Sequence, residues 1–235
     1  MFELICDTLQ AHGIASIRFD FNGHGQSEGE FKDMTVPNEI EDAKKVVEYV
    51  SSLRYVDGLA IVGHSQGGVV ASMTAGELSE ALGKPAFKAV ALMAPAAVLR
   101  EDAIRGNTMG KMYDPFDPGE YVELFGGLKL GGNYIRTAFS LPIYETAAKY
   151  QGPAIIVHGN ADLFHPFLRE SVTNRQVLDT HIGTILDEDV AHTGILVIVT
   201  LINTVGTCPR VGHLHISQCA LTIGIDQVVS GIVAY

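Results

Sequence analysis

The residues best suited to chemistry form the pentapeptide Gly63-His64-Ser65-Gln66-Gly67, a G-x-S-x-G pattern. It follows an unbroken apolar run at residues 59–63 and opens a helical pattern at 67–82, which is the strand-to-helix context that the motif requires. A turn this tight strains the serine backbone, and the glycines let neighbouring backbone pass without a Cβ clash. The pattern predicts Ser65 as a nucleophile, with an ordinary glycine-rich turn as the alternative.

The same turn offers a hydrogen-bond donor for the negative charge that develops when a serine attacks a carbonyl. The N–H of Gln66 comes directly after Ser65, at the positive end of the predicted helix. We therefore expect this N–H to contribute to an oxyanion hole.

A serine nucleophile needs a histidine base and an acid that orients it, in the chain order Ser, Asp, His. Asp162 follows a predicted strand at 154–158, at the carboxyl end where sites of open α/β sheets gather. His192 follows an acidic loop farther along the chain and is the predicted base. A turn aspartate and a loop histidine without a role are the alternatives. Other histidines in this part of the chain are His165, His181, His213 and His215.

His213 and His215 alternate within the stretch GHLHIS and are typical of one face of a strand. They could also pair on a metal, but no third ligand is evident in the sequence. We expect no metal and no organic cofactor.

Strand and helix patterns alternate along the first two thirds of the chain. Strands are predicted at residues 14–21, 59–63, 87–93 and 154–158, and helices at 39–53 and 67–82. Pro37 lies in the first turn of the helix at 39–53, where its missing N–H costs little. This alternation predicts an α/β domain whose parallel sheet is covered by helices on both faces.

The alternation stops between residues 96 and 148, a stretch rich in Gly, Asp, Pro and Tyr. Long irregular insertions at the carboxyl edge of a parallel sheet are often lids or substrate loops. We therefore interpret 96–148 as a cap inserted into a single domain that covers 1–235.

The composition excludes several classes of protein. Of 235 residues, 47% are hydrophobic and 18% charged, which excludes a disordered chain. A net charge of −11 disfavours nucleic acid and anionic membranes as partners. Three scattered cysteines, no visible signal peptide and no membrane-spanning apolar run favour a cytoplasmic setting. A small-molecule ester is the expected partner, and a homodimer is left open.

Several segments closely resemble bacterial cinnamoyl (feruloyl) esterases of the α/β-hydrolase fold. The matching segments are GIASIRFDFNGHGQSEG, NEIEDAKKVVEYV, GHSQGGVVASM, LMAPAAVLREDAIRGNT, GLKLGGNYIRTAFSLPIYETAAKY and GPAIIVHGNAD. The resemblance implies an α/β-hydrolase fold with a mostly parallel sheet, and hydrolysis of hydroxycinnamate esters by Ser65 with Asp162 as the acid.

The resemblance also assigns residues of the cap to the substrate. It implies that Asp102 meets the phenolic hydroxyl of the substrate and that Tyr134 contacts its ring. Met109 occupies a position where relatives often carry glutamine, so a polar contact expected there is missing. A helix N-cap is the alternative interpretation of Asp102.

Two departures from the family concern the ends of the chain. The first strands of the family fold are missing, one of which would lie between the strands at 14–21 and 59–63. We expect those two strands either to pair directly or to leave backbone groups unpaired, and the chain to be weakly active and prone to associate. All eight lysines lie at or before Lys149, and the tail beyond His192 is apolar and β-type rather than an amphipathic helix.

The sequence thus predicts a serine carboxylesterase that hydrolyses feruloyl or cinnamoyl esters through a Ser65–His192–Asp162 triad and an acyl-enzyme. An esterase or lipase with another acyl preference is one alternative. A truncated, catalytically inactive hydrolase domain is the other.

Overall fold

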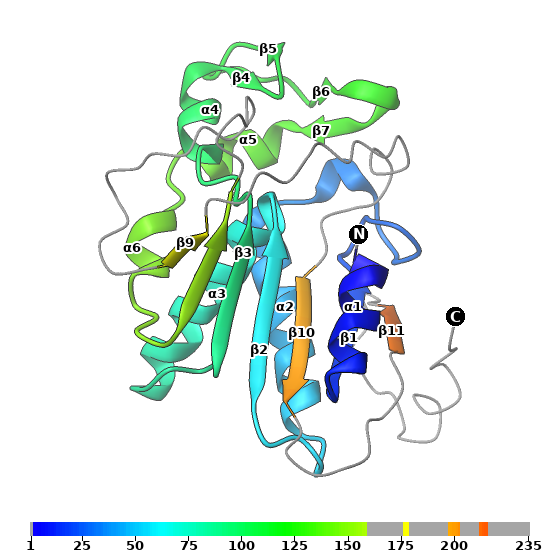
Figure 1. Cartoon of the computed structure of the whole chain (residues 1–235). Helices are drawn as coiled ribbons and strands as arrows, with labels where there is room; N and C mark the ends of the chain where they lie inside the picture. The colour runs from blue at the N-terminus through cyan, green and yellow to red at the C-terminus, as the bar shows by residue number, and fades with distance from the viewer. Residues whose placement is uncertain (1, 159–175, 179–196, 203–211, 216–235) are drawn as a thin grey trace.

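The computed structural model of the chain describes residues 2–158, 176–178, 197–202 and 212–215 (Figure 1). Within these residues, seven strands form one sheet in the order β11-β1-β10-β2-β3-β8-β9. Their bounds are β1 Ile14–Asp20, β2 Leu59–His64, β3 Ala89–Met93, β8 Ala154–Val157, β9 Gln176–Leu178, β10 Val197–Ile202 and β11 Gly212–His215. Neighbouring strands are parallel except where β10 is a partner. The predicted mostly parallel α/β sheet is confirmed.

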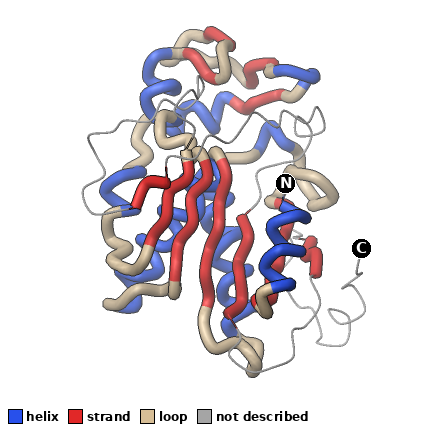
Figure 2. Tube along the Cα trace, viewed as in Figure 1, coloured by secondary structure: helices blue, strands red, loops and turns tan. Residues whose placement is uncertain are grey.

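Helices cover both faces of this sheet, as Figure 2 shows. Helices α2 (Val36–Ser51) and α3 (Gln66–Leu82) lie behind the sheet in Figure 1, and α1 (Phe2–Ala11) lies in front of it. Helix α2 begins before the predicted residue 39, because the Thr35 hydroxyl caps it by accepting a hydrogen bond from the Asn38 N–H (3.3 Å). Pro37 lies in the first turn, as predicted. No described helix is both long and apolar enough to cross a membrane.

Strand β10 overturns one expectation about the sheet. It comes from the apolar tail and lies between β1 and β2, antiparallel to both. Val199 is in register with Ile17 on one side and with Ile61 on the other. The expectation that β1 and β2 pair directly or leave their backbone groups unpaired is therefore wrong. The physical reason is that a late apolar segment supplies the hydrogen-bonding partners that both strands need.

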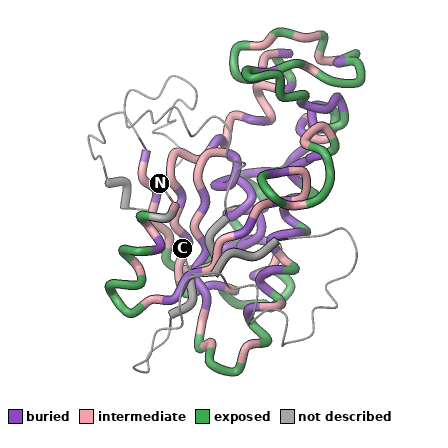
Figure 3. Tube along the Cα trace, turned by 90° about the vertical axis from the view of Figure 1, so that its right-hand side faces the viewer, coloured by how far each residue is buried: buried purple, intermediate pink, exposed green. Residues whose placement is uncertain are grey.

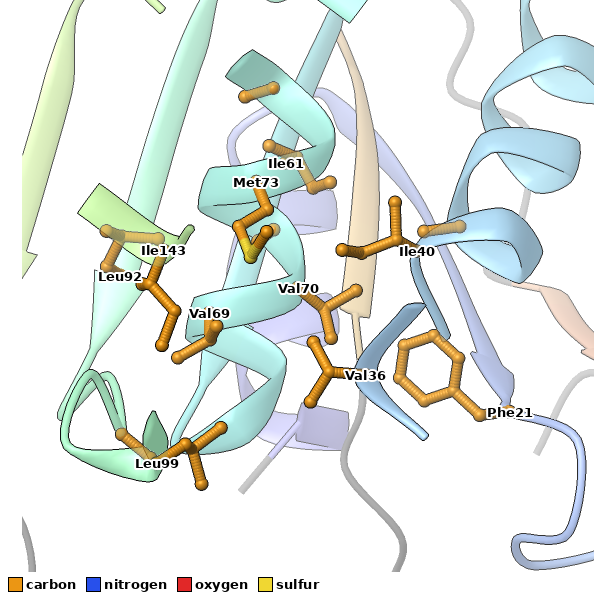
Figure 4. Packing of buried hydrophobic residues seen from close by; sticks show 14 of the residues in the cluster. Phe21, Val36, Ile40, Ile61, Val69, Val70, Met73, Leu92, Leu99 and Ile143 are labelled. Carbon is orange, nitrogen blue, oxygen red and sulfur yellow. The ribbon is translucent and has the colours of Figure 1, made fainter. Parts of the chain in front are cut away.

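The position of helix α3 is fixed by a core on several of its sides. Figure 4 shows Val69, Val70 and Met73 between side chains of the sheet, of α2 and of the cap, and all three are buried. Removing a side chain such as Val70 from water contributes ~1.5–3 kcal/mol. Because α3 is apolar on most sides, its first turn is held firmly beneath the carboxyl ends of the strands.

Most of residues 96–148 lies over the carboxyl end of the sheet, whereas α6 (Ile143–Ala147) lies at its side and packs against α3 (Figure 1). Much of this stretch forms short helices and two hairpins. These are α4 Leu99–Arg105, β4 Asn107–Thr108, β5 Lys111–Met112, β6 Tyr121–Glu123, the 3₁₀ turn η2 Phe125–Gly127, β7 Lys129–Gly131, α5 Gly132–Ala138 and α6 Ile143–Ala147. A further 3₁₀ turn, η1 (Phe31–Asp33), precedes α2. The outer part of the cap is largely exposed (Figure 3).

The pairing of β10 gives a prediction about stability. Proline at position 199 removes the backbone N–H of a strand that has neighbours on both sides. We expect Val199→Pro to lower the free energy of unfolding by at least ~1–3 kcal/mol, measured by urea denaturation. Val199→Ile keeps the N–H and is the control. Equal urea midpoints for the two variants would contradict this pairing.

Candidate active site

Ser65 lies on a strained turn between β2 and α3. Its backbone angles are φ 54° and ψ −124°, a region that side-chain-bearing residues rarely adopt. Such a conformation costs on the order of 1–3 kcal/mol and persists only where surrounding structure imposes it. The predicted elbow geometry at Ser65 is therefore present.

Two close approaches of the backbone impose this turn. A Cβ atom at Gly63 would lie 2.0 Å from the carbonyl oxygen of Gly67, and one at Gly68 would lie 2.8 Å from the Pro95 Cβ. Only glycine fits at either position. The predicted reason for the glycines is confirmed at Gly63, and Gly68 adds close packing against the segment that follows β3.

Backbone hydrogen bonds to the end of β3, to the segment after it and to α3 also hold Ser65 in place. Its N–H donates to the Met93 carbonyl (3.0 Å), and its carbonyl accepts from Ala96 N–H (2.9 Å) and Gly68 N–H (2.9 Å). Ala94, between these contacts, also has a positive φ of 40° and donates to the Val157 carbonyl (2.7 Å). The ends of three adjacent parallel strands are thus tied together around the serine.

The N–H of Gln66 is at the start of α3, where N–H groups have no partner within their own helix. Ser65 is the N-cap residue of α3, and its side chain makes no capping hydrogen bond. An N–H in this position can donate to an anion beside Ser65, because the helix dipole is positive there. The geometry is compatible with the predicted oxyanion role of Gln66.

The Gln66 side chain points away from solvent into a polar cluster beneath the cap. Its Nε2 donates to Glu39 Oε2 (2.8 Å), and its Oε1 accepts from the Tyr134 hydroxyl (2.8 Å). Its Nε2 also approaches the Met34 sulfur at 3.4 Å. Glu39, Gln66 and Tyr134 are all buried. Side chains from α2, α3 and α5 therefore meet next to the candidate nucleophile.

Burial governs the protonation of this cluster. It raises the pKa of Glu39 to about 8, although the hydrogen bond from Gln66 acts in the opposite direction. Burial also raises the pKa of Tyr134 well above its usual value, and the nearby Glu39 carboxyl adds to the effect. Both shifts favour the protonated forms at neutral pH.

The structure places the three predicted cap residues in different surroundings. Asp102 is half-buried on α4, and the alternative of a helix N-cap is wrong because Val98 occupies that position. Met109 is 52% exposed in the two-residue turn between β4 and β5, with a φ of 51°. Tyr134 is 2% exposed, and its hydroxyl is bonded to Gln66. Tyr134 is thus buried, Asp102 half-buried and Met109 exposed.

Asp102 lies near two phenols. Burial is the main cause that raises the pKa of the Tyr113 hydroxyl, and the negative charge of Asp102 adds to it. Asp102 also contributes to the raised pKa of Tyr134. The Asp102 carboxyl therefore acts electrostatically on both phenolic hydroxyls.

Asp162 and His192 lie outside the described residues, as do His165 and His181. His213 and His215 fall on β11, which confirms the predicted strand there. The described residues contain no group of three His, Cys, Asp or Glu side chains that could hold a metal ion.

Sequence reasoning missed the contact of the Gln66 side chain with Glu39. Glu39 belongs to the predicted amphipathic helix, where a glutamate is normally assigned to the solvent face. The sequence did indicate where Glu39 lies along its helix, because Glu39 comes four residues after the capping residue Thr35 and directly before the buried Ile40. This spacing places Glu39 in the first turn but does not indicate which residue it contacts.

The sheet, the cap and the strained serine between β2 and α3 define an α/β hydrolase. A family model described as serine aminopeptidase, S33, matches residues 1–118, and the chain belongs to this family. No curated protein sequence matches.

Two solved structures of Est1E from Butyrivibrio proteoclasticus resemble this fold. The structure with ferulic acid bound is 33% identical with a TM-score of 0.59, and the match covers 63% of this chain and 57% of Est1E. The second is 31% identical with a TM-score of 0.53, and the match covers 57% of this chain and 54% of Est1E. The chain thus spans little more than half of the length of Est1E in these matches.

The strain at Ser65 gives a second prediction about stability. Glycine adopts a positive φ without steric cost, whereas alanine keeps the Cβ atom that strains the turn. We expect the free energy of unfolding of Ser65→Gly to exceed that of Ser65→Ala by about 1 kcal/mol, after allowing for the greater freedom of glycine in the unfolded chain. Ser65→Gly should therefore unfold at the higher temperature. Thermal unfolding followed by circular dichroism measures the difference. A Ser65→Gly variant less stable than Ser65→Ala would show that the turn is not strained.

Proposed function

We propose that the chain is a serine carboxylesterase and that Ser65 is its nucleophile. The observation that carries the proposal is the Ser65 turn, in which a strained serine follows the central strand β2 and precedes the Gln66 N–H at the start of α3. An ordinary glycine-rich turn has no need of a serine with a positive φ. Membership of a hydrolase family supports the same conclusion.

In the proposed reaction, the Ser65 hydroxyl oxygen attacks the carbonyl carbon of an ester. The Gln66 N–H stabilises the resulting oxyanion, and the bond to the alcohol breaks to leave an acyl-enzyme. Water then hydrolyses the acyl-enzyme and releases the acid. We assign the proton transfers to His192 and the orientation of its imidazole to Asp162, following the chain order Ser, Asp, His.

We further propose hydroxycinnamate esters as the substrates. Est1E, whose structure contains ferulic acid, is 33% identical to this chain over the matched part. The cap also carries the Asp102 carboxyl, which acts electrostatically on the phenols of Tyr113 and Tyr134, and this supports the proposal. We assign Asp102 to the phenolic hydroxyl of the substrate and Tyr134 to its ring. We place the exposed Met109 at the outer edge of the substrate site.

A test of the nucleophile uses covalent labelling by a fluorophosphonate, together with hydrolysis of p-nitrophenyl acetate. Ser65→Ala removes the attacking oxygen, so we expect it to lose both the label and the esterase activity. Ser72→Ala, farther along the same helix, removes a hydroxyl that donates to the Val69 carbonyl (2.9 Å) and is the matched control. Undiminished labelling of Ser65→Ala would refute the assignment.

A second test separates hydroxycinnamate esters from other acyl groups. Asp102→Ala removes the proposed acceptor of the phenolic hydroxyl, and a hydrogen bond to a charged group contributes ~1.5–3 kcal/mol. We expect kcat/KM on methyl ferulate to fall by roughly tenfold or more, with little change on p-nitrophenyl acetate. Glu101→Ala, the adjacent acidic residue of α4, controls for loss of charge. Equal losses on both esters would favour an esterase or lipase of another acyl preference.

A further inference from the structure

Glu39 is an unusual neighbour for an oxyanion donor, because it is a carboxyl group with 1% exposure. It lies in the first turn of α2, and its Oε2 accepts a hydrogen bond of 2.8 Å from the side chain of Gln66. Carboxyl groups are rarely this buried without a partner that requires them. The proposed reaction uses only the backbone of Gln66, so it does not account for Glu39.

The tautomer of His24 indicates how Glu39 is protonated. His24 Nδ1 is 3.2 Å from the Asn22 carbonyl oxygen, which can only accept, so Nδ1 carries the proton and Nε2 of the neutral ring is an acceptor. His24 Nε2 faces Glu39 Oε1 at 3.8 Å, and both atoms are buried without another hydrogen-bond partner among the described residues. A proton on Oε1 suits this arrangement, since Oε2 already accepts from Gln66.

The groups around this pair favour its neutral form. Burial raises the pKa of Glu39, and the negative charge of Asp42 adds to the increase. Burial lowers the pKa of His24 despite opposing contributions from Asn22, Asp20 and Asp42. Both shifts favour a neutral carboxyl at Glu39 and a neutral ring at His24.

The result is a pair of hydrogen bonds from the cap to Glu39, which in turn lies 3.8 Å from His24 in the segment after β1. The Tyr134 hydroxyl donates to Gln66 Oε1, Gln66 Nε2 donates to Glu39 Oε2, and Glu39 Oε1 faces His24. The two hydrogen bonds join α5, α3 and α2 at the residue that follows the nucleophile. Because the Ser65 side chain does not cap α3, these bonds restrain the first turn of that helix.

We propose that Glu39 is a positioning residue that acts as a neutral carboxylic acid, fixing the Gln66 side chain and thereby the backbone N–H that Gln66 directs at the oxyanion. The inference rests on the proposed function, in which that N–H stabilises the transition state. Tyr134 fixes the other end of the same side chain. A small displacement of a preorganised donor is costly, since loss of one such donor reduces kcat by roughly 10²–10³.

Glu39→Gln and Glu39→Leu form the matched pair that tests this inference. Glutamine keeps an oxygen that accepts from Gln66 and offers an N–H to His24 Nε2, whereas leucine has similar bulk but cannot accept. Turnover of p-nitrophenyl acetate is measured per serine labelled by the fluorophosphonate, so that unfolded molecules do not count. This substrate has no free phenolic hydroxyl to contact Asp102.

We expect Glu39→Leu to lower kcat per labelled serine by roughly tenfold or more, with little change in KM, because a misplaced donor weakens binding of the transition state only. Glu39→Gln should recover most of that loss. Unchanged kcat for Glu39→Leu would reduce Glu39 to a purely structural role. A loss as large in Glu39→Gln would show that an ionised carboxylate is required, which also overturns the inference.

The pH profile is a readout that a structural role would not change. As pH rises through about 8, Glu39 ionises and brings a negative charge near the developing oxyanion. The groups that face Glu39 are His24, Asp42, Gln66 and Tyr134. We expect kcat of the wild type to fall above pH 8 and that of Glu39→Gln to stay level. Parallel profiles for the two proteins would contradict the inference.

The labelling experiment distinguishes failure of this inference from failure of the proposed function, and a second variant replaces Glu39→Leu if that variant does not fold. If wild-type Ser65 is not labelled, the proposed function fails before Glu39 is tested. If Glu39→Leu does not fold, Tyr134→Phe removes the opposite hydrogen bond to Gln66 with almost no change in volume. It should lower kcat per labelled serine on p-nitrophenyl acetate several-fold, and an unchanged kcat would overturn the inference.

Discussion

The close crossing of β2 onto α3 is the constraint on which the rest of this structure depends. Gly63 passes so near the Gly67 carbonyl that no side chain fits, and Ser65 must take its strained angles to complete the turn. The cost of on the order of 1–3 kcal/mol is offset by the buried side chains of α3 and by the hydrogen bonds of Ser65 to the β3 side. The strained geometry of the candidate site thus depends on the packing of the core around α3.

Much of the fold can be predicted from local patterns in the sequence. The strands at 14–21, 59–63, 87–93 and 154–158 and the two long helices are close to the observed elements, because apolar periodicity reports which face each element buries. The position of β10 could not be predicted in this way. Its apolar residues indicate a buried strand, but neither its neighbours nor its direction is encoded locally, since both depend on which slot of the sheet is vacant.

In the candidate site too, features encoded by neighbouring residues could be predicted, and contacts between distant residues could not. Ser65 and the Gln66 N–H follow from a contiguous motif whose chemistry is backbone geometry, and the structure has that geometry. The Glu39–Gln66–Tyr134 contacts join three helices, and no spacing within one helix predicts them. A buried glutamate also runs against the usual distribution of charge on amphipathic helices. Asp162 and His192 remain predictions from chain order.

The place of β10 in the sheet has a consequence for the order in which the chain folds. As the polypeptide leaves the ribosome, β1, α2 and β2 emerge long before the residues that separate β1 from β2 in the finished sheet. Until then, two strand edges lack their partner and can pair with other chains. Contacts between residues so distant in sequence form slowly. Folding of this protein in the cell is therefore exposed to aggregation during synthesis, and a chaperone that shields strand edges would raise the yield of folded enzyme.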